Sequence, residues 1–443
     1  MTGNRRHADA LPHGDPFALP AALPAALGGS VSRATVAAIW IIAIYLFAKM
    51  FYVAKSGMAQ PADAMLCVLA FFIVPPRSML ALLKGELALV ALVVWIALVN
   101  LTWFMITNDA SFLTSTLYYL FNLLIVIAFF GVRSRNPALF DRIVCNAIVA
   151  AVLVETAVVL YQRLSGMSAL RTIGTFRNPN QLAYWGIIML SMFVMLRRNK
   201  LRRSDLLVMA AGIFCQYASA SRAGLIALLA LLVVWLYFAL GTGRKRVIAC
   251  LGVVAVGTLL ALSPAMDSSA VSGAGQTAVG ARLTEESETS QFDERQYNRI
   301  IDYYQYTIFG AGEGYLARFN VGREFTLEIH SSLGTMLFSY GVPGFGLFML
   351  FLFNVYRRLP LSLSIYLMPS LLYGVTHQGL RFTLFWGLIG VAIAMGREYQ
   401  QAPKRAASAP PLRRPHEERG PDYLRALAGA SSRRDRPAGH GAE

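Results

Sequence analysis

A histidine and several arginines stand in short polar stretches that separate long apolar runs. Arg222 lies in SASRAGL, Arg295 lies in FDERQYNR, and His330 lies in EIHSSLGTMLF. Arginine guanidinium groups form bidentate hydrogen bonds to phosphate oxygens. A neutral imidazole can accept a proton from an attacking hydroxyl near neutral pH. Together these residue types fit group transfer from a diphosphate-linked donor.

Other polar residues also lie in short polar stretches between apolar runs. The stretch RTIGTFRNPNQLAYW favours a turn followed by a helix that begins near residue 181 or 182, with Asn180 as its N-cap. A second histidine and another arginine lie in THQGLRF. The candidate substrate-binding residues are Arg177, Asn178, Asn180, Arg299, His377 and Arg381.

Each of these residues also has a purely structural interpretation. The asparagines could serve only to begin a helix, and Arg222 could extend its charged end toward lipid phosphates. Arg299 could belong to a solvated, salt-bridged helix face, and His330 could merely precede a helix. What favours a site is that all of them are predicted on one side of a membrane.

The composition places these residues in a membrane protein. The chain has 443 residues, of which 56% are hydrophobic and 14% charged, and its mean hydropathy is positive. With about 20 apolar residues per span, the sequence predicts an all-α polytopic protein of about 12 transmembrane helices. The predicted spans are 35–54, 63–82, 87–107, 112–132, 142–162, 182–196, 205–220, 223–240, 247–263, 332–354, 361–375 and 382–396.

Charge and cysteine usage narrow the chemistry further. The net charge of +16 comes mainly from Lys and Arg in loops assigned to the cytoplasm, which follows the positive-inside rule and gives no reason to expect nucleic-acid binding. This assignment puts both termini in the cytoplasm and the candidate site on the outer face. The four cysteines stand in apolar runs without a CxxC pair, so neither a disulfide framework nor a metal site is predicted.

The predicted organisation has five parts: a disordered cytoplasmic N-terminus (1–34), nine transmembrane helices (35–263), a long outer loop (264–331), three more transmembrane helices (332–397) and a disordered basic tail (398–443). The tail is expected to touch anionic lipid headgroups. Within the loop, residues 295–307 are predicted to form one helix with Tyr297, Ile300, Ile301 and Tyr304 on one face. The glycines of FGAGEGY are predicted to end that helix.

Four motifs in the same order, GTFRNPNQLA, SASRAGLIAL, FGAGEGY and HSSLGTMLFSYGVPGFGLF, make residues 172–351 resemble the bacterial O-antigen ligase and polymerase family. The resemblance implies a helical bundle similar to the GT-C glycosyltransferases, in the inner membrane. It also implies transfer of a glycan from undecaprenyl diphosphate to an acceptor sugar at the periplasmic face, without metal or other cofactor. Arg222 and Arg295 would then bind the diphosphate, and His330 would orient or deprotonate the acceptor hydroxyl. Ser331 stands where many members have Asn, and the short spacing to FGAG leaves Arg295 and Arg299 as alternatives for the second arginine.

Several functions remain open at this point. Within the family, the motif around His330 looks more like a polysaccharide polymerase, while a ligase would deliver the chain to a lipid A core. Lys49 and Glu155 inside predicted spans instead suit a transporter or flippase. A non-catalytic partner of polysaccharide assembly and export proteins would tolerate lysine in place of Arg222 and Arg295, whereas a transferase would not.

Overall fold

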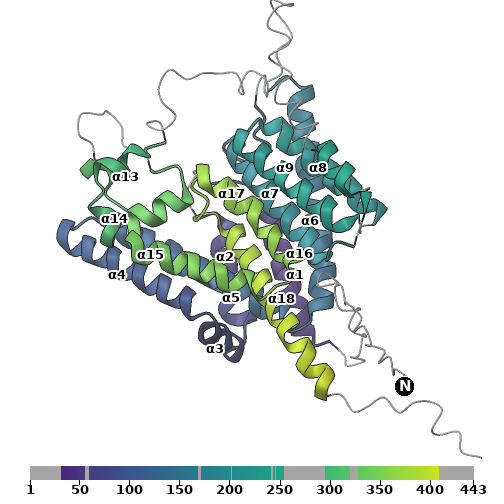
Figure 1. Cartoon of the computed structure of the whole chain (residues 1–443), viewed down its shortest axis with the longest axis horizontal. Coiled ribbons are helices and arrows are strands. Elements are labelled where there is room, and N and C mark those ends of the chain that lie inside the picture. The colour runs from purple at the N-terminus through teal and green to yellow at the C-terminus, as the bar shows by residue number, and fades with distance from the viewer. Residues whose placement is uncertain are drawn as a thin grey trace, which may run out of the picture. The chain divides into compact units, whose positions relative to one another are not determined.

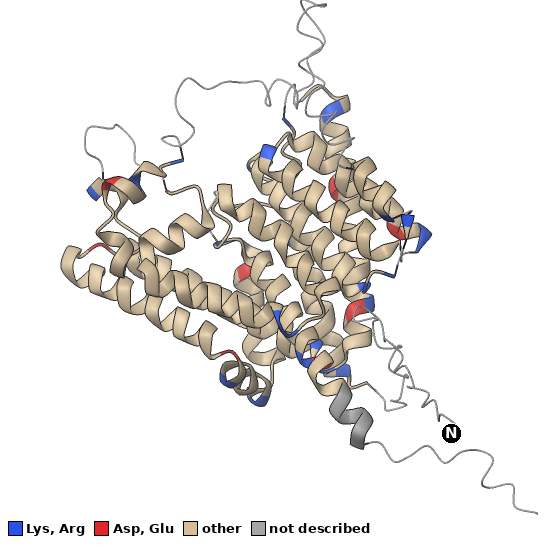
Figure 2. Cartoon of the chain, in the orientation of Figure 1, with Lys and Arg blue, Asp and Glu red and all other residues tan. Residues whose placement is uncertain are grey.

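The computed structural model describes residues 31–54, 59–167, 171–200, 202–240, 243–244, 246–253, 295–319 and 328–408 (Figure 1). Regular structure in these ranges is helical, and the chain is a multi-pass helical membrane protein. Six of the described helices are long and apolar enough to cross a membrane: α4 (Leu87–Thr107), α5 (Ser111–Arg133), α6 (Pro137–Leu164), α7 (Pro179–Leu196), α9 (Arg222–Ala239) and α15 (Ser332–Tyr356). Figure 2 shows that α4 and α15 carry no charged residue along their lengths.

These six helices coincide with six of the predicted spans, but the count of about twelve is not confirmed. Shorter elements correspond to other predicted spans: α1 (Arg33–Ala48), α8 (Arg203–Ser219), and the run α16 (Leu361–Ser364), η2 (Ile365–Leu367) and α17 (Met368–Thr376). The last helix, α18 (Thr383–Ser408), extends beyond the predicted boundary at residue 397. Most of the predicted span 247–263, residues 1–30, most of the loop 264–331 and residues 409–443 lie outside the described residues. The chain divides after Arg397 into two units, and the candidate site lies in the first.

The second predicted span is broken rather than continuous. It consists of α2 (Pro61–Ile73) and α3 (Pro76–Gly85), which meet at an angle of 105°. Proline lacks the amide N–H that continues a helix and disfavours helical geometry at the preceding residue. Pro75 and Pro76 are adjacent, and Val74 before them is extended. The apolar run 63–82 therefore could not form one straight helix.

Helix α7 forms the buried centre around which other helices pack. Every residue from Leu182 to Leu196 is buried, and α7 contacts α6, α8, α9 and α17. The prediction that Asn180 caps this helix was wrong. Asn178 is the N-cap, its side chain accepting a hydrogen bond from the Gln181 amide, and Pro179 takes the first helical position, where its missing N–H costs nothing. The cap fixes the backbone conformation where the preceding turn joins α7.

Helix α15 is interrupted at Gly341, whose φ of 67° and ψ of −176° are not helical. In an unbroken helix the carbonyls of residues 338, 339 and 340 would accept from residues 342, 343 and 344, and Pro343 has no amide N–H to donate. Other donors replace them. The amides of Ala311 and Gly312 donate to Phe338 and Ser339 over 2.9 and 2.8 Å, and the Trp95 indole donates to Tyr340 over 2.7 Å.

The interruption in α15 therefore binds the segment that follows two short helices, α13 (Asn298–Asp302) and α14 (Tyr306–Phe309). Figure 1 shows α14 beside α15 and near the end of α4, and α14 contacts α15. Gly310 ends α14 with a φ of 107°, so the predicted glycine stop is confirmed. Because the backbone of Ala311 and Gly312 is hydrogen-bonded to α15, the rest of FGAGEGY lies against the transmembrane helices.

The single helix predicted for residues 295–307 was wrong. Tyr303 adopts a non-helical conformation between α13 and α14, which turns the chain. The turn lets Tyr297, Ile300 and Tyr303 pack against a buried cluster. Ile301 and Tyr304, predicted on the packing face, are exposed instead. Burial of the aromatic side chains outweighs continuation of a regular helix.

We expect Gly310→Ala to lower the free energy of unfolding by about 1–3 kcal/mol, because a Cβ there would be strained at positive φ and would meet the Cα of Tyr340 at 2.7 Å. Thermal unfolding in detergent measures the loss. The matched control is Gly346→Ala, since a Cβ at Gly346 in α15 meets nothing within 4 Å. Equal unfolding temperatures for the two variants would contradict this account of the contact.

Candidate functional site

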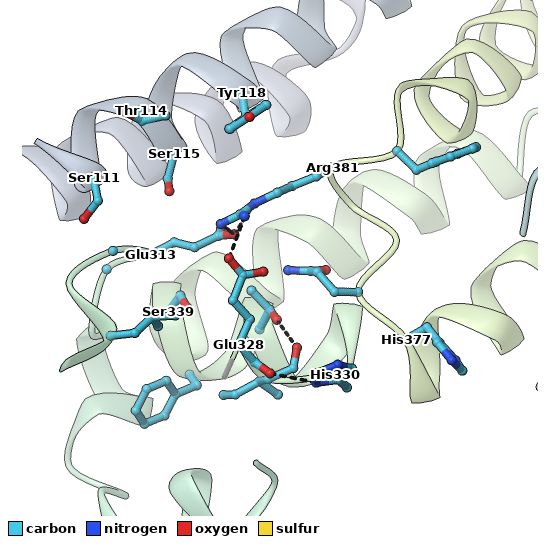
Figure 3. Close-up of a pocket in the computed structure, with 18 of the residues that line it drawn as sticks. Ser111, Thr114, Ser115, Tyr118, Glu313, Glu328, His330, Ser339, His377 and Arg381 are labelled. Atoms are coloured by element: carbon cyan, nitrogen blue, oxygen red, sulfur yellow. Dashed lines mark hydrogen bonds and ion pairs between the residues drawn. The ribbon is translucent and has the colours of Figure 1, made fainter. Parts of the chain in front are cut away.

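A cavity of about 910 Å³ lies between helix α5, the start of α7, the segments around residues 312–319 and 328–339, and the turn after α17. It brings together motifs that are far apart in the sequence. Figure 3 shows side chains from α5 on one side of this space and those of Glu313, Glu328 and His330 on the other. The predicted site residues that line it are Asn178, Asn180, Arg299, His330, His377 and Arg381.

His330 is held by its backbone just before α15 begins. Ser331 is the N-cap of that helix, its hydroxyl accepting from the Gly334 amide over 3.0 Å. The His330 amide donates to the Arg295 carbonyl over 3.1 Å, and the Tyr297 hydroxyl donates to the His330 carbonyl over 3.0 Å. These bonds join the end of the loop to its described beginning.

The imidazole of His330 is also oriented. Its Nδ1 lies 2.9 Å from the main-chain carbonyl oxygen of Glu328. A carbonyl oxygen can only accept a hydrogen bond, so Nδ1 carries a proton, and in the neutral form of the ring the lone pair is on Nε2. The neutral ring therefore has one defined basic atom, which is the requirement for a general base.

His377 lies after α17, where its carbonyl accepts from the Ser332 amide and hydroxyl, each over 3.1 Å. Its ring stacks on Tyr373 with centroids 4.6 Å apart. Burial lowers the pKa of His377 to about 3, and the neighbouring basic side chains, with Arg295 first among them, add to the effect. His377 is consequently neutral at physiological pH.

Arg295 and Arg171 complete what we call the basic cluster, namely Arg171, Arg295, His330 and His377. Arg295 donates to the Thr376 carbonyl over 2.6 Å, next to His377. Arg171 donates to the Asn180 side-chain oxygen over 3.0 Å, which orients Asn180 at the cavity wall. Arg171 was not among the predicted site residues, although it opens the GTFRNPNQLA region. Two permanent cations thus lie near two imidazoles that line the cavity, although neither Arg295 nor Arg171 is among the described residues that line it.

Arg381 has a different role from the one predicted. Its guanidinium pairs with Glu313 over 2.6 Å and with Glu328 over 2.7 Å, as Figure 3 shows, and lies 5.5 Å from the ring centre of Tyr118. Glu313 also accepts from the Tyr119 and Tyr340 hydroxyls over 2.9 and 2.8 Å. Two carboxylates balance this cation, which leaves less of its charge to attract a phosphate, and substrate binding by Arg381 stays a prediction.

Glu313 and Glu328 were missed as site residues. A signal was present, because an arginine at a membrane boundary needs an anionic partner and both glutamates stand in outer-face motifs. The sequence did not show which arginine each glutamate pairs with, because that depends on how distant segments pack together. Their pairing with Arg381 connects the FGAGEGY segment, the stretch before His330 and the turn before α18.

The remaining predicted arginines lie in different surroundings. Arg299 is 4% exposed, lines the cavity and lies 5.1 Å from the ring centre of Phe319, so it is not part of a solvated helix face. Arg177 is exposed and donates to the Val53 carbonyl over 2.7 Å. Arg222 begins α9 after its N-cap Ser221 and is not among the described residues that line the cavity. Of the two alternatives for the loop arginine, Arg295 contacts the histidine backbone while Arg299 faces the cavity.

The two intramembrane charges that suited a transporter have structural partners. Glu155 is buried and accepts from the Thr175 amide over 3.0 Å and from its hydroxyl over 2.6 Å, which holds the turn before α7. Lys49 forms a buried ion pair with Asp63 and lines the cavity. Asp63 also accepts from the Thr383 hydroxyl over 2.7 Å. The contacts of both charged residues therefore explain their presence as structural, without a role in transport.

Within the described ranges, no group of three or more His, Cys, Asp or Glu residues is placed to hold a metal ion. The four cysteines, all in described helices, are free thiols. Neither a protein-family model nor a curated protein matches the chain. The chemistry of the cavity is therefore the basis for proposing a function.

We expect Arg381→Met to lower the free energy of unfolding by about 3–5 kcal/mol, because it leaves the buried Glu313 carboxylate without its cation. Arg77→Met, at an exposed position in α3, is the control and should change stability by less than about 0.5 kcal/mol. Denaturant unfolding in detergent measures both. Equal effects would show that the Arg381 ion pairs do not stabilise the fold.

The depressed pKa of His377 predicts a stability that falls on acidification. The folded protein binds this proton only near pH 3, whereas an unfolded histidine binds it near pH 6.5, so the unfolded state gains protons first as the pH drops. The unfolding temperature of the wild type should decline from about pH 6.5 downward. His377→Gln, which does not titrate, should show a shallower decline. Parallel curves for the two proteins would refute the assignment.

Proposed function

We propose that this protein is a membrane glycosyltransferase that moves a glycan from undecaprenyl diphosphate to a hydroxyl of a second glycan, as a repeat-unit polymerase. The observation that carries the proposal is the basic cluster, in which His330, with an oriented ring, and His377 line the cavity, and Arg295 and Arg171 lie close enough to His377 to lower its pKa. A diphosphate needs concentrated positive charge, and a sugar acceptor needs a base. The resemblance of residues 172–351 to the O-antigen ligase and polymerase family points the same way.

The basic cluster would bind the donor diphosphate. Arg295 and Arg171 supply charge that does not vary with pH, and neutral His377 can donate a hydrogen bond without adding charge. By the resemblance, Arg222 at the start of α9 would contribute a further cation. As the bond from the anomeric carbon to the phosphate oxygen breaks, this oxygen takes the electron pair, and fixed cations stabilise the charge that develops there.

His330 would act as the base. Its Nε2 takes the proton of the acceptor hydroxyl while the hydroxyl oxygen forms the new bond to the anomeric carbon. The hydrogen bond from Nδ1 to the Glu328 carbonyl keeps the ring in the tautomer that this step requires. The proton finally resides on His330, and the undecaprenyl diphosphate leaves with the bonding electrons.

The opposite wall of the cavity suits the acceptor glycan. Ser111, Thr114, Ser115 and Tyr118 recur at helical spacing on α5 (Figure 3). All four line the cavity, and so does Asp109. Hydroxyl and carboxylate groups exchange hydrogen bonds with sugar hydroxyls, and the described residues of this wall lack the cations that a diphosphate needs. Donor and acceptor would thus occupy chemically different ends of one space.

We place this reaction at the periplasmic face of the inner membrane. The placement rests on the positive-inside pattern, in which the loops with most Lys and Arg are cytoplasmic and the cavity motifs lie on the other side. The donor lipid would reach the cavity from the bilayer. A lipid A core in place of a growing polymer as acceptor would make the protein a ligase.

The test uses purified full-length protein in lipid nanodiscs with defined undecaprenyl-diphosphate-linked repeat units, with and without a lipid A core acceptor, and measures product masses. We expect products longer by whole repeat units. His330→Ala and Arg295→Lys should lose at least about 100-fold in rate and leave the donor unused, since each removes a group needed in the transition state. The control Arg77→Lys, at an exposed position far from these motifs in the sequence, should retain wild-type activity.

Other outcomes would change the assignment. Glycan found only on lipid A core would replace the polymerase by the ligase. Movement of the intact donor across a vesicle membrane without any new glycosidic bond would favour a flippase. Retention of activity in Arg295→Lys would remove the need for bidentate phosphate contacts, and with it the main argument for the basic cluster.

A further inference from the structure

The two short helices α13 and α14 expose large apolar side chains away from the cavity. The exposed fractions are 64% for Ile301, 70% for Tyr304, 55% for Ile308 and 70% for Phe309. The opposite side of this segment packs against the buried cluster that contains Ala311, Ile329 and Phe338. These exposed residues therefore form a second apolar surface that the described contacts of the fold leave open. Such a surface marks an interaction site more often than a water-facing loop.

The segment that carries this surface packs directly against two candidate transmembrane helices. The indole of Trp103 in α4 donates to the Gly310 carbonyl over 2.9 Å, and its ring lies 5.5 Å from that of Tyr306. At the break in α15, a Cβ on Gly341 would meet the Phe309 carbonyl carbon at 2.6 Å. The backbone of α14 thus touches α4 near its C-terminus and α15 at its interruption.

Both transmembrane helices expose apolar side chains at these same levels. Met105 and Ile106 in the last turn of α4, and Val342 next to the α15 interruption, are among the most exposed apolar residues in the described chain. In a membrane-spanning helix such side chains face acyl chains. The segment with the apolar surface of α13 and α14 therefore packs against helices whose own exposed apolar side chains suit acyl chains.

We infer that α13 and α14 lie in the boundary between headgroups and acyl chains, in the leaflet that holds the C-terminal end of α4. The exposed polar residues of the segment limit its depth. Asp302 and Gln305 are exposed beside the apolar side chains and must stay at headgroup level. Tyrosine is a favoured residue at this depth, and short amphipathic segments bind there. The inference does not depend on the proposed reaction.

The test measures depth directly in the full-length protein. The four native cysteines, at positions 67, 145, 215 and 250, are replaced by serine or alanine, and a nitroxide label is attached to a single new cysteine in lipid nanodiscs. Phe309→Cys, or Ile308→Cys if the first does not reconstitute, reports the apolar surface. Gln305→Cys on the same segment is the matched polar control, and Met105→Cys on α4 is the lipid-facing reference.

Oxygen concentrates in the acyl region, whereas a water-soluble nickel chelate is excluded from it, so the ratio of their collision rates reports depth. We expect this ratio at position 309 to exceed that at 305 several-fold and to approach that at 105. Equal ratios at 309 and 305 would place the surface in water and overturn the inference. Protection of position 309 from both reagents would overturn it as well, because protein would then cover the surface, either another part of this chain or a second copy.

Discussion

The break in α15 at Gly341 is the constraint on which the arrangement of the cavity depends. Three carbonyls that a regular helix would satisfy internally accept instead from Ala311, Gly312 and the Trp95 indole. Unpaired carbonyls are costly in an apolar environment, so the replacement is obligatory. It fixes the FGAGEGY backbone and puts Glu313 within 2.6 Å of Arg381. Arg381 in turn holds Glu328, whose carbonyl orients His330.

The arginines in and near the cavity differ in whether their partners are charged or neutral. Arg381 pairs with two carboxylates, whereas Arg295 donates to the Thr376 carbonyl and Arg171 donates to the side-chain oxygen of Asn180. A hydrogen bond to a neutral carbonyl, such as that of Arg295, does not cancel the charge of the guanidinium. This difference separates a structural arginine from a candidate phosphate ligand, and it could not be deduced from the fact that both lie on the outer face.

The sequence was sufficient where a local pattern determines the outcome. Apolar runs predicted six helices that the structure contains, and the glycines after Phe309 predicted the end of α14. His330, His377 and Asn180 were selected from helix ends and do line one cavity. Local patterns failed where a distant partner decides: aromatic packing broke the loop helix, and the partners of Arg381 lie 68 and 53 residues away. The bend at Pro75 and Pro76 is different, because its signal was local and the apolar run was nevertheless predicted as one span. Asn178 was selected for substrate binding, yet it was missed as the cap because Asn180 satisfies the same local preference.

The link between Glu328 and His330 has a consequence for how such a site varies among sequences. Residue 328 serves the histidine through its main chain and serves Arg381 through its side chain. The first function is available to any residue that keeps this backbone conformation, so a substitution can remove the ion pair and preserve the orientation of the imidazole. Position 328 can therefore lose its side-chain contact with Arg381 in an alignment while its main-chain contribution to the histidine persists. A search for invariant residues would not find it.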